Sequence, residues 1–110
     1  MIRLAKPEEY PDRVGEVRFV AEEDGKAVGF ICVSRIPSRE GEQCWIHDLE
    51  CEGDEMAAAS LMLRARSQAN TWGFQDVWAN VSNRRLAKAL LAHGWEEKQV
   101  ILKGKTSNGN

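Results

Sequence analysis

The hydrophobic pattern of the sequence changes its period near residue 52, and this change limits the folds that the chain can adopt. Before it lie three extended runs: residues 14–21 alternate between apolar and polar side chains, residues 26–36 are apolar on both faces, and residues 43–51 follow. An Asp24-Gly25 pair joins the first two runs and is typical of a hairpin turn. The pattern therefore predicts an antiparallel sheet, with residues 37–42 as a loop and residues 2–5 as a further short strand.

After residue 52 the spacing of apolar residues is helical. From about residue 54 to residue 72 they recur every three or four positions, and Gly73 follows as a helix stop. Residues 74–81 predict a strand, so that strand, helix and strand form a parallel crossover. A second helix is expected from Asn83 to Gly94, and a last strand over residues 95–103. The fold class is therefore α+β, a mixed and mostly antiparallel sheet with one parallel βαβ unit.

Length and charge exclude several classes of protein. A chain of 110 residues suits a single domain, here residues 1–104, with a flexible polar tail at 105–110. Fifteen basic against 17 acidic residues give a net charge of -2, which lacks the positive field that holds nucleic acid. No apolar run reaches the ~18 residues that span a membrane, and the amino terminus has no apolar signal core, so a cytoplasmic protein without a membrane partner is expected.

The cysteines predict neither cross-links nor a metal centre. Cys32, Cys44 and Cys51 form an odd set, without CxxC spacing and without a histidine cluster. We expect reduced thiols and no metal site. Because the sequence supplies no Cys-His-Asn arrangement, Cys51 is interpreted as a packed thiol and not as a nucleophile.

Three segments together resemble the GNAT superfamily of acyl-CoA N-acyltransferases. AVGFICVSR looks like the third strand of that family and IHDLEC like its fourth, while Asn83 through His93-Gly94-Trp95 is similar to its closing motif. The resemblance implies a small, degenerate GNAT-like fold with acetyl-CoA as co-substrate. Two helices that usually wall the acceptor site are absent, because few residues separate Leu4 from Val14. The fourth and fifth strands should then be parallel neighbours, splayed at one end to leave a cleft.

The resemblance also assigns residues to the CoA site. Main-chain groups of Leu49 and Cys51 would align the thioester, and Asn83 would bind pantetheine or hold a water, although an ordinary helix N-cap is an alternative. The pyrophosphate would lie at a helix amino terminus, against Ala57, Ala58, Ala59 and Ser60. The glycine-rich phosphate loop of the family is missing, and acidic residues that would repel CoA stand nearby: Glu50, Glu52, Asp54 and Glu55.

His47 is the leading catalytic candidate, since several relatives carry a carboxylate base at its place and imidazole accepts a proton near neutrality. A structural or exposed histidine is the alternative. Strict alternation places Asp48 on the opposite strand face, so no His47–Asp48 dyad is expected, and Glu50 would replace His47 as base in a different register. Leu90 occupies the place of the tyrosine that often protonates the thiolate.

Two functions compete on these residues. The first is an N-acetyltransferase that acts on an amine of a protein or another exposed acceptor, since the acceptor side lacks its wall. The second is a catalytically inactive module with this fold, phage-type or accessory, that binds a protein partner. Either way, an uncovered sheet face predicts a homodimer.

Overall fold

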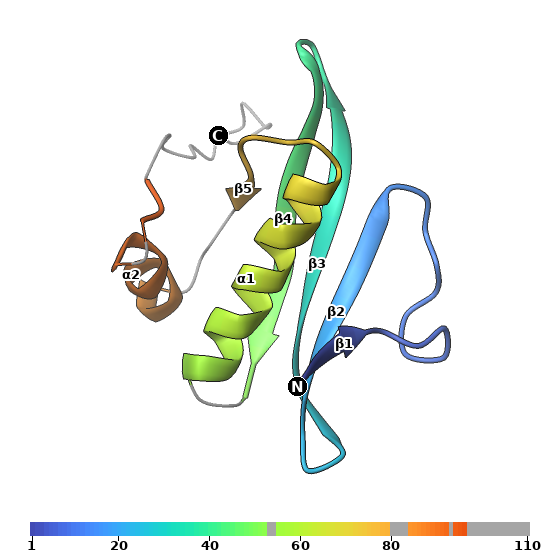
Figure 1. The fold of residues 1–110 in the computed structure, drawn as a ribbon, viewed down its shortest axis with the longest axis vertical. Coiled ribbons are helices and arrows are strands. Elements are labelled where there is room, and N and C mark those ends of the chain that lie inside the picture. The colour runs from blue at the N-terminus through green and yellow to red at the C-terminus, as the bar shows by residue number, and fades with distance from the viewer. Residues whose placement is uncertain (53–54, 80–83, 93, 97–110) are drawn as a thin grey trace, which may run out of the picture. The chain divides into compact units, whose positions relative to one another are not determined.

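In the computed structural model, residues 1–52, 55–79, 84–92 and 94–96 are described, and they form two compact units, Met1–Asn80 and Val81–Asn110 (Figure 1). The first contains a five-stranded sheet in the order β1-β2-β3-β4-β5 and one helix. Its elements are β1 (Ile2–Leu4), β2 (Glu16–Glu23), β3 (Lys26–Ser38), β4 (Gly41–Cys51), α1 (Glu55–Thr71) and β5 (Trp78–Ala79). The second contains α2 (Arg84–Ala92). The prediction of a single domain over 1–104 stays a prediction.

The α+β class and the predicted mixture of strand directions are confirmed. Strands β1 to β4 are antiparallel, and β5 runs parallel to β4, with Trp45 opposite Trp78 and Ile46 opposite Ala79. The crossover from β4 through α1 to β5 is the predicted βαβ unit. Within the described residues, the segment between β1 and β2 contains turns but no helix, which confirms that the usual first helices are missing. The splayed cleft stays a prediction.

Local signals account for where most elements end. Asp24 and Gly25 both have positive φ, 52° and 75°, as the predicted tight turn between β2 and β3 requires. Gly73 ends α1 at φ 90°, and the amide of Phe74 donates to the carbonyl of Ala69 across it. Gly94 has φ 91° after α2, again as predicted. Asn83 and the predicted strand at 95–103, apart from its first two residues, lie outside the described residues, as does the tail.

The predicted loop at residues 37–42 is wrong. β3 continues to Ser38 and β4 starts at Gly41, so a long two-stranded hairpin replaces it, with Pro37 opposite Glu42. Pairing of β2 with β3 ends at Ser34, so this part of the hairpin extends beyond β2. A proline removes a backbone donor, and it is tolerated here because β2 does not need that donor.

One face of the sheet is apolar and is covered by α1. Phe19, Ile31 and Val33 are at most 1 % exposed on this face, and Leu61 and Ala65 of α1 are fully buried. Two arginines extend the packing: the guanidinium of Arg64 lies 5.1 Å from the Phe19 ring, and that of Arg35 lies 5.0 Å from the Trp72 ring. The core of this unit therefore lies between α1 and one side of β2, β3 and β4.

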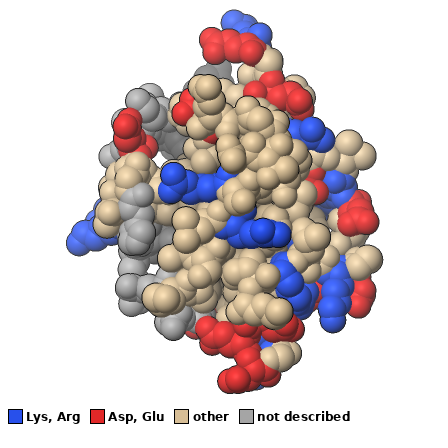
Figure 2. All heavy atoms as spheres, in the orientation of Figure 1, with Lys and Arg blue, Asp and Glu red and all other residues tan. Residues whose placement is uncertain are grey.

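Charges of both signs surround this core. In Figure 2, basic side chains cross the middle of the view, where Figure 1 places α1. Acidic side chains gather at the lower end of the view, near the turn between β2 and β3.

None of the described helices is long and apolar enough to cross a membrane. Cys32, Cys44 and Cys51 are free thiols, the first two buried.

Candidate functional site

The face of the sheet opposite α1 carries a row of polar side chains. Glu16 pairs with Ser34 across β2 and β3, and Ser34 pairs in turn with Trp45 on β4. The next pairs along the same face are Arg18 with Cys32 and Cys32 with His47. Because directly paired residues of antiparallel strands point to the same side, these three strands bring the polar side chains together.

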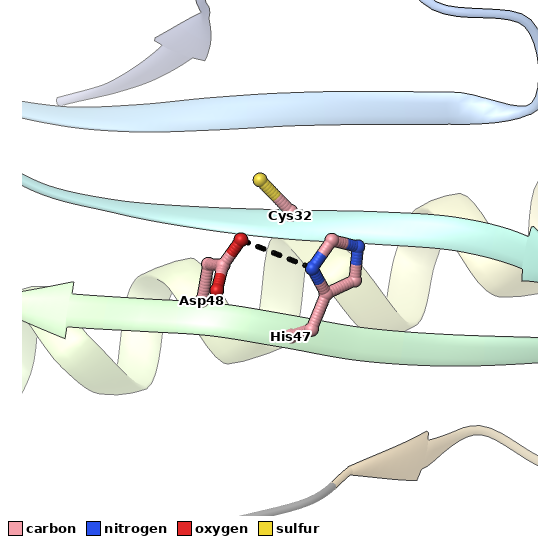
Figure 3. A group of neighbouring side chains, drawn as sticks. All are labelled: Cys32, His47 and Asp48. Atoms are coloured by element: carbon pink, nitrogen blue, oxygen red, sulfur yellow. Dashed lines mark hydrogen bonds and ion pairs between the residues drawn. The ribbon is translucent and has the colours of Figure 1, made fainter.

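A β-bulge in β4 changes the expected position of Asp48. Cys32 pairs with His47 but Phe30 pairs with Glu50, so Asp48 is one residue too many for β3, and its φ is 54°. Figure 3 shows the result: His47 Nδ1 lies 3.1 Å from Asp48 Oδ2. The prediction that the two residues could not form a pair is therefore wrong, because strict alternation fails at the bulge.

The same bulge changes the position of Glu50. Alternation predicts His47 and Glu50 on opposite faces, but the extra residue places Glu50 opposite Phe30, on the face that carries His47. Glu50 is exposed there. Both predicted catalytic candidates consequently lie on one side of the sheet, and their catalytic roles stay predictions.

A chain of hydrogen bonds leads from His47 into the sheet. His47 Nε2 lies 2.7 Å from Ser34 Oγ, and Ser34 Oγ donates to Glu16 Oε2 at 3.3 Å. Tyr10 donates its hydroxyl to the other oxygen of Glu16. This bond is the main reason that the pKa of Tyr10 rises to about 12, because a phenolate would face the carboxylate. The site therefore contains a continuous path from Tyr10 to Asp48.

Arg18 and Cys32 lie beside this path. Arg18 Nε donates to Cys32 Sγ at 3.2 Å, and its guanidinium stacks between two rings, 3.7 Å from Phe30 and 4.1 Å from Tyr10. Burial raises the pKa of the Cys32 thiol above its ordinary value, although Arg18 opposes this shift. Cys32 is consequently a protonated, packed thiol near neutral pH.

Cys32, His47 and Asp48 place one sulfur, one nitrogen and one oxygen within 4.8 Å of one another, a grouping that could hold a metal ion. Sequence spacing does not reveal it, because Cys32 and His47 meet only through strand pairing. In Figure 3 the sulfur points toward β2, where Arg18 donates to it. The guanidinium charge beside the thiol opposes a cation there, so the hydrogen-bonding function of His47 is the better supported one.

The residues predicted for CoA lie around the end of β4 and the start of α1. Leu49 and Cys51 end β4, where Gly29 permits close approach: a Cβ at Gly29 would lie 2.8 Å from the Glu50 carbonyl oxygen. Ala57, Ala58, Ala59 and Ser60 lie in the first two turns of α1. Since α1 begins at Glu55, the amides of Ala59 and Ser60 bond within the helix, and only its first turn can offer amides to an anion. Asn83 lies outside the described residues.

A hollow of about 370 Å³ lies beside the start of α1, on the side of β1 and β2. Ala57 and Ser60 line it together with Glu22 and Glu23. The two glutamates make this hollow unsuitable for a phosphate. In the other unit, Leu90 lies in α2 and is buried, so it offers no proton donor at the place of the family tyrosine.

Sequence reasoning missed three members of the site: Tyr10, Glu16 and Ser34. A signal existed for two of them, since extending the hairpin back from Asp24-Gly25 pairs the strand of Glu16 with that of Ser34. Tyr10 lies in the segment between β1 and β2, and no periodic pattern places it.

No family model and no curated protein matches the sequence. Solved structures do match the fold. An aminoglycoside N-acetyltransferase AAC(6')-Iy in complex with CoA has a TM-score of 0.80 and 18% identity, with 97% of this chain and 100% of that chain covered. A GCN5-related N-acetyltransferase from Ralstonia eutropha JMP134 has a TM-score of 0.73 and 16% identity, with 84% and 67% covered.

A predicted acetyltransferase from Clostridium acetobutylicum, solved with acetyl-CoA, has a TM-score of 0.69 and 15% identity. The similarity covers 83% of this chain but only 64% of that protein, so the chain spans less than two thirds of its length. These identities are too low to transfer an activity, whereas the agreement in topology is extensive. The chain therefore has the GNAT fold, the fold of the acyl-CoA N-acyltransferases.

Proposed function

We propose that the protein is an N-acetyltransferase that moves an acetyl group from acetyl-CoA to an amine of an exposed acceptor, such as a protein. The observation that carries the proposal is the hydrogen-bonded His47 at the bulge of β4, on the sheet face opposite α1. Two structures with the same fold contain CoA or acetyl-CoA, which supports acetyl-CoA as co-substrate. The three free cysteines suit a reducing compartment such as the cytoplasm.

In the proposed reaction the amine nitrogen attacks the thioester carbonyl. The carbon–sulfur bond then breaks, CoA leaves as a thiolate, and His47 takes the proton that the amine loses. A thiol with a pKa of roughly 8.5 departs without a tyrosine to protonate it, so Leu90 does not exclude the reaction. Glu50, exposed on the same face, is the alternative base.

The CoA site is proposed at the end of β4 and the start of α1. Main-chain groups of Leu49 and Cys51 align the thioester. The amino-terminal end of α1 receives the pyrophosphate through its positive dipole, outside the hollow that Glu22 and Glu23 line, and Ala57, Ala58, Ala59 and Ser60 are the small residues beside it. The small side chains allow close approach, and the nearby exposed Glu50 and Glu52 weaken the affinity for a polyanion.

The acceptor and the oligomeric state follow from the missing helices. The described segment between β1 and β2 contains no helix and contributes Tyr10 to this face, so a large acceptor such as a protein would approach His47 beside Tyr10. A second copy of the chain is the proposed cover for the rest of this face. Light scattering at micromolar concentration should give the mass of a dimer, and a monomer mass would contradict it.

The experiment is CoA release from acetyl-CoA with a panel of lysine peptides and small amines, beside calorimetric titration with acetyl-CoA. His47→Ala should lower the rate of transfer by about 10²-fold and leave the affinity for acetyl-CoA nearly unchanged. Glu42→Ala, on the same strand but exposed and distant, is the control and should keep the wild-type rate. Equal rates for wild type and His47→Ala would remove His47 from the reaction.

A catalytically inactive module that binds a protein partner is the second candidate. The acidic side chains of Glu50 and Glu52 at the end of β4, and Leu90 in place of a proton donor, favour it. This candidate predicts no CoA release above hydrolysis from wild type or from Leu90→Tyr, and no heat of binding with acetyl-CoA. Binding of acetyl-CoA with measurable turnover would exclude it.

A further inference from the structure

The polar side chains around His47 form more hydrogen-bond contacts than they have donor protons. Four contacts form the path: Tyr10 to Glu16, Ser34 to Glu16, Ser34 to His47, and His47 to Asp48. With both carboxylates ionised, the donors are one phenol, one hydroxyl and, for neutral imidazole, one N–H. Three protons cannot serve four contacts. While His47 is neutral, one of the contacts must therefore lack a proton.

Burial decides which contact that is. Ser34 is 7 % exposed and the Glu16 side chain 15 %, whereas the side chains of His47 and Asp48 are 36 % and 61 % exposed. An acceptor deprived of its donor costs more inside the protein than at the surface, where water replaces the donor. Ser34 therefore keeps its bond to Glu16, and the Ser34 oxygen remains to accept a proton from His47 Nε2. The contact without a proton is the exposed one, between Nδ1 and Asp48.

We infer that Glu16 and Ser34 are positioning residues that hold neutral His47 with its proton on Nε2, so that Nδ1, on the exposed side of the ring, is the atom that accepts a proton. The inference deepens the proposed function, on which its catalytic part rests. The charge of Glu16 acts in the same direction, since its Oε2 lies 3.9 Å from Nε2. The opposite arrangement, in which Ser34 donates to Nε2 and Nδ1–H to Asp48, is that of a Ser-His-Asp triad.

Protonation of Nδ1 completes the network. The imidazolium donates from Nε2 to Ser34 and from Nδ1 to Asp48, so all four contacts then have a proton. Asp48 thus stabilises the charged ring that forms when the amine is deprotonated. Titratable and charged groups around the ring are Glu16 and Arg18 on β2, Cys32 on β3, Asp48 and Glu50 on β4, and Tyr10.

The test is nitrogen-15 NMR of the imidazole rings in a His93→Asn background, where His47 is the one remaining histidine. At a pH where the ring is neutral, we expect a protonated signal for Nε2 and an unprotonated signal for Nδ1. Ser34→Ala removes the acceptor of Nε2–H, and Asp48 should then draw the proton to Nδ1. Ser38→Ala, on the same strand but away from the site, should leave the spectrum unchanged.

Two outcomes would overturn the inference: a proton on Nδ1 in the wild type, which is the triad arrangement, or the same tautomer in wild type and Ser34→Ala. The NMR result does not depend on turnover, so it separates this inference from the proposed function. In an active protein, Ser34→Ala should lower kcat several-fold with an unchanged KM for acetyl-CoA, while Ser38→Ala keeps both. A proton on Nε2 without any CoA release would leave the tautomer established and refute the proposed reaction.

Discussion

The two faces of the sheet are built from the same strands but differ in chemistry. On the side of α1, Phe19, Ile31 and Val33 are packed against the helix with almost no exposure. On the other side, the neighbours Arg18, Cys32 and Ser34 form hydrogen bonds. Because side chains alternate along a strand, one face of the sheet forms the packed core and the other carries the polar interactions. Substitutions on the α1 face should change the free energy of unfolding, whereas substitutions on the polar face should change protonation and rate.

The largest effect is expected from Leu61→Ala on the α1 face. Leu61 is completely buried, and its truncation removes apolar contacts and leaves a cavity, which costs about 3 kcal/mol of unfolding free energy. Urea unfolding measures this loss. Leu63→Ala is the matched control, because Leu63 lies on the same helix at 64% exposure and should cost less than about 0.5 kcal/mol. Similar losses in the two variants would contradict the packing of α1 on this face.

Gly29→Ala should have the next largest effect, where β3 and β4 come close beside the bulge. The new Cβ would lie 2.8 Å from the Glu50 carbonyl oxygen and 3.0 Å from Cys51 Cα, backbone atoms that cannot turn aside. We expect a loss of about 1–3 kcal/mol in urea unfolding. Ala27→Ser, exposed on the same strand, should be nearly neutral. A neutral Gly29→Ala would show that the two strands are farther apart at this point.

On the polar face, Glu16→Gln should lower the pKa of Tyr10 from about 12 toward its ordinary value, because the bond to Glu16 is the main cause of the shift. The phenol is bound in its neutral form, so its contribution to stability is complete below pH ~10 and is lost as the pH rises through about 12. Absorbance titration measures this directly, since the chain has one tyrosine. An unchanged pKa would mean that Tyr10 does not bind Glu16.

The smallest effect is expected at the edge of the sheet, where Arg3 binds Glu9 through two hydrogen bonds of 2.7 and 3.0 Å. This pairing lowers the pKa of Glu9 from 4.5 to about 2. Its contribution to stability is therefore present above pH 4.5 and is lost as the pH falls toward 2. Glu9→Gln should flatten the pH dependence of stability in this window, measured by acid unfolding. Glu8→Gln, exposed in the same turn, should not, and equal curves for both variants would contradict the pairing.

The sequence predicted those parts of the fold that depend on local signals. Asp24-Gly25 defines a turn whose two residues need positive φ, and the change to a helical period marks α1, so the strand order and the crossover follow. Residues 37–42 misled because proline and glycine are loop formers, yet pairing extends through Pro37 beyond the end of β2. Pro37 is tolerated because β2 has already ended and needs no backbone donor from it. The end of β2 lies far away in the sequence, so a short stretch of sequence around Pro37 does not reveal it.

The candidate site was less predictable for a related reason. His47 was a candidate because of the family resemblance of its strand, but Ser34 and Glu16 join it through pairing between strands. The bulge was decisive, because one extra residue brought Asp48 and Glu50 to the face of His47. Bulges have weak sequence signals, and the positive φ of Asp48 that marks this one is seen only in the structure.

The bulge also allows the Asp48 carboxylate beside His47 to be removed by a deletion. Cys32 pairs with His47 and Phe30 pairs with Glu50, so two residues of β4 face the single residue Ile31. In a chain without residue 48, Ile31 would pair with Leu49 and the strand pairing would be regular. Asp48 is thus an inserted residue of β4 that has no pairing partner on β3. A one-residue deletion, which in most strands would turn every later side chain to the wrong side, would here leave Leu49, Glu50 and Cys51 where they are and take away one negative charge.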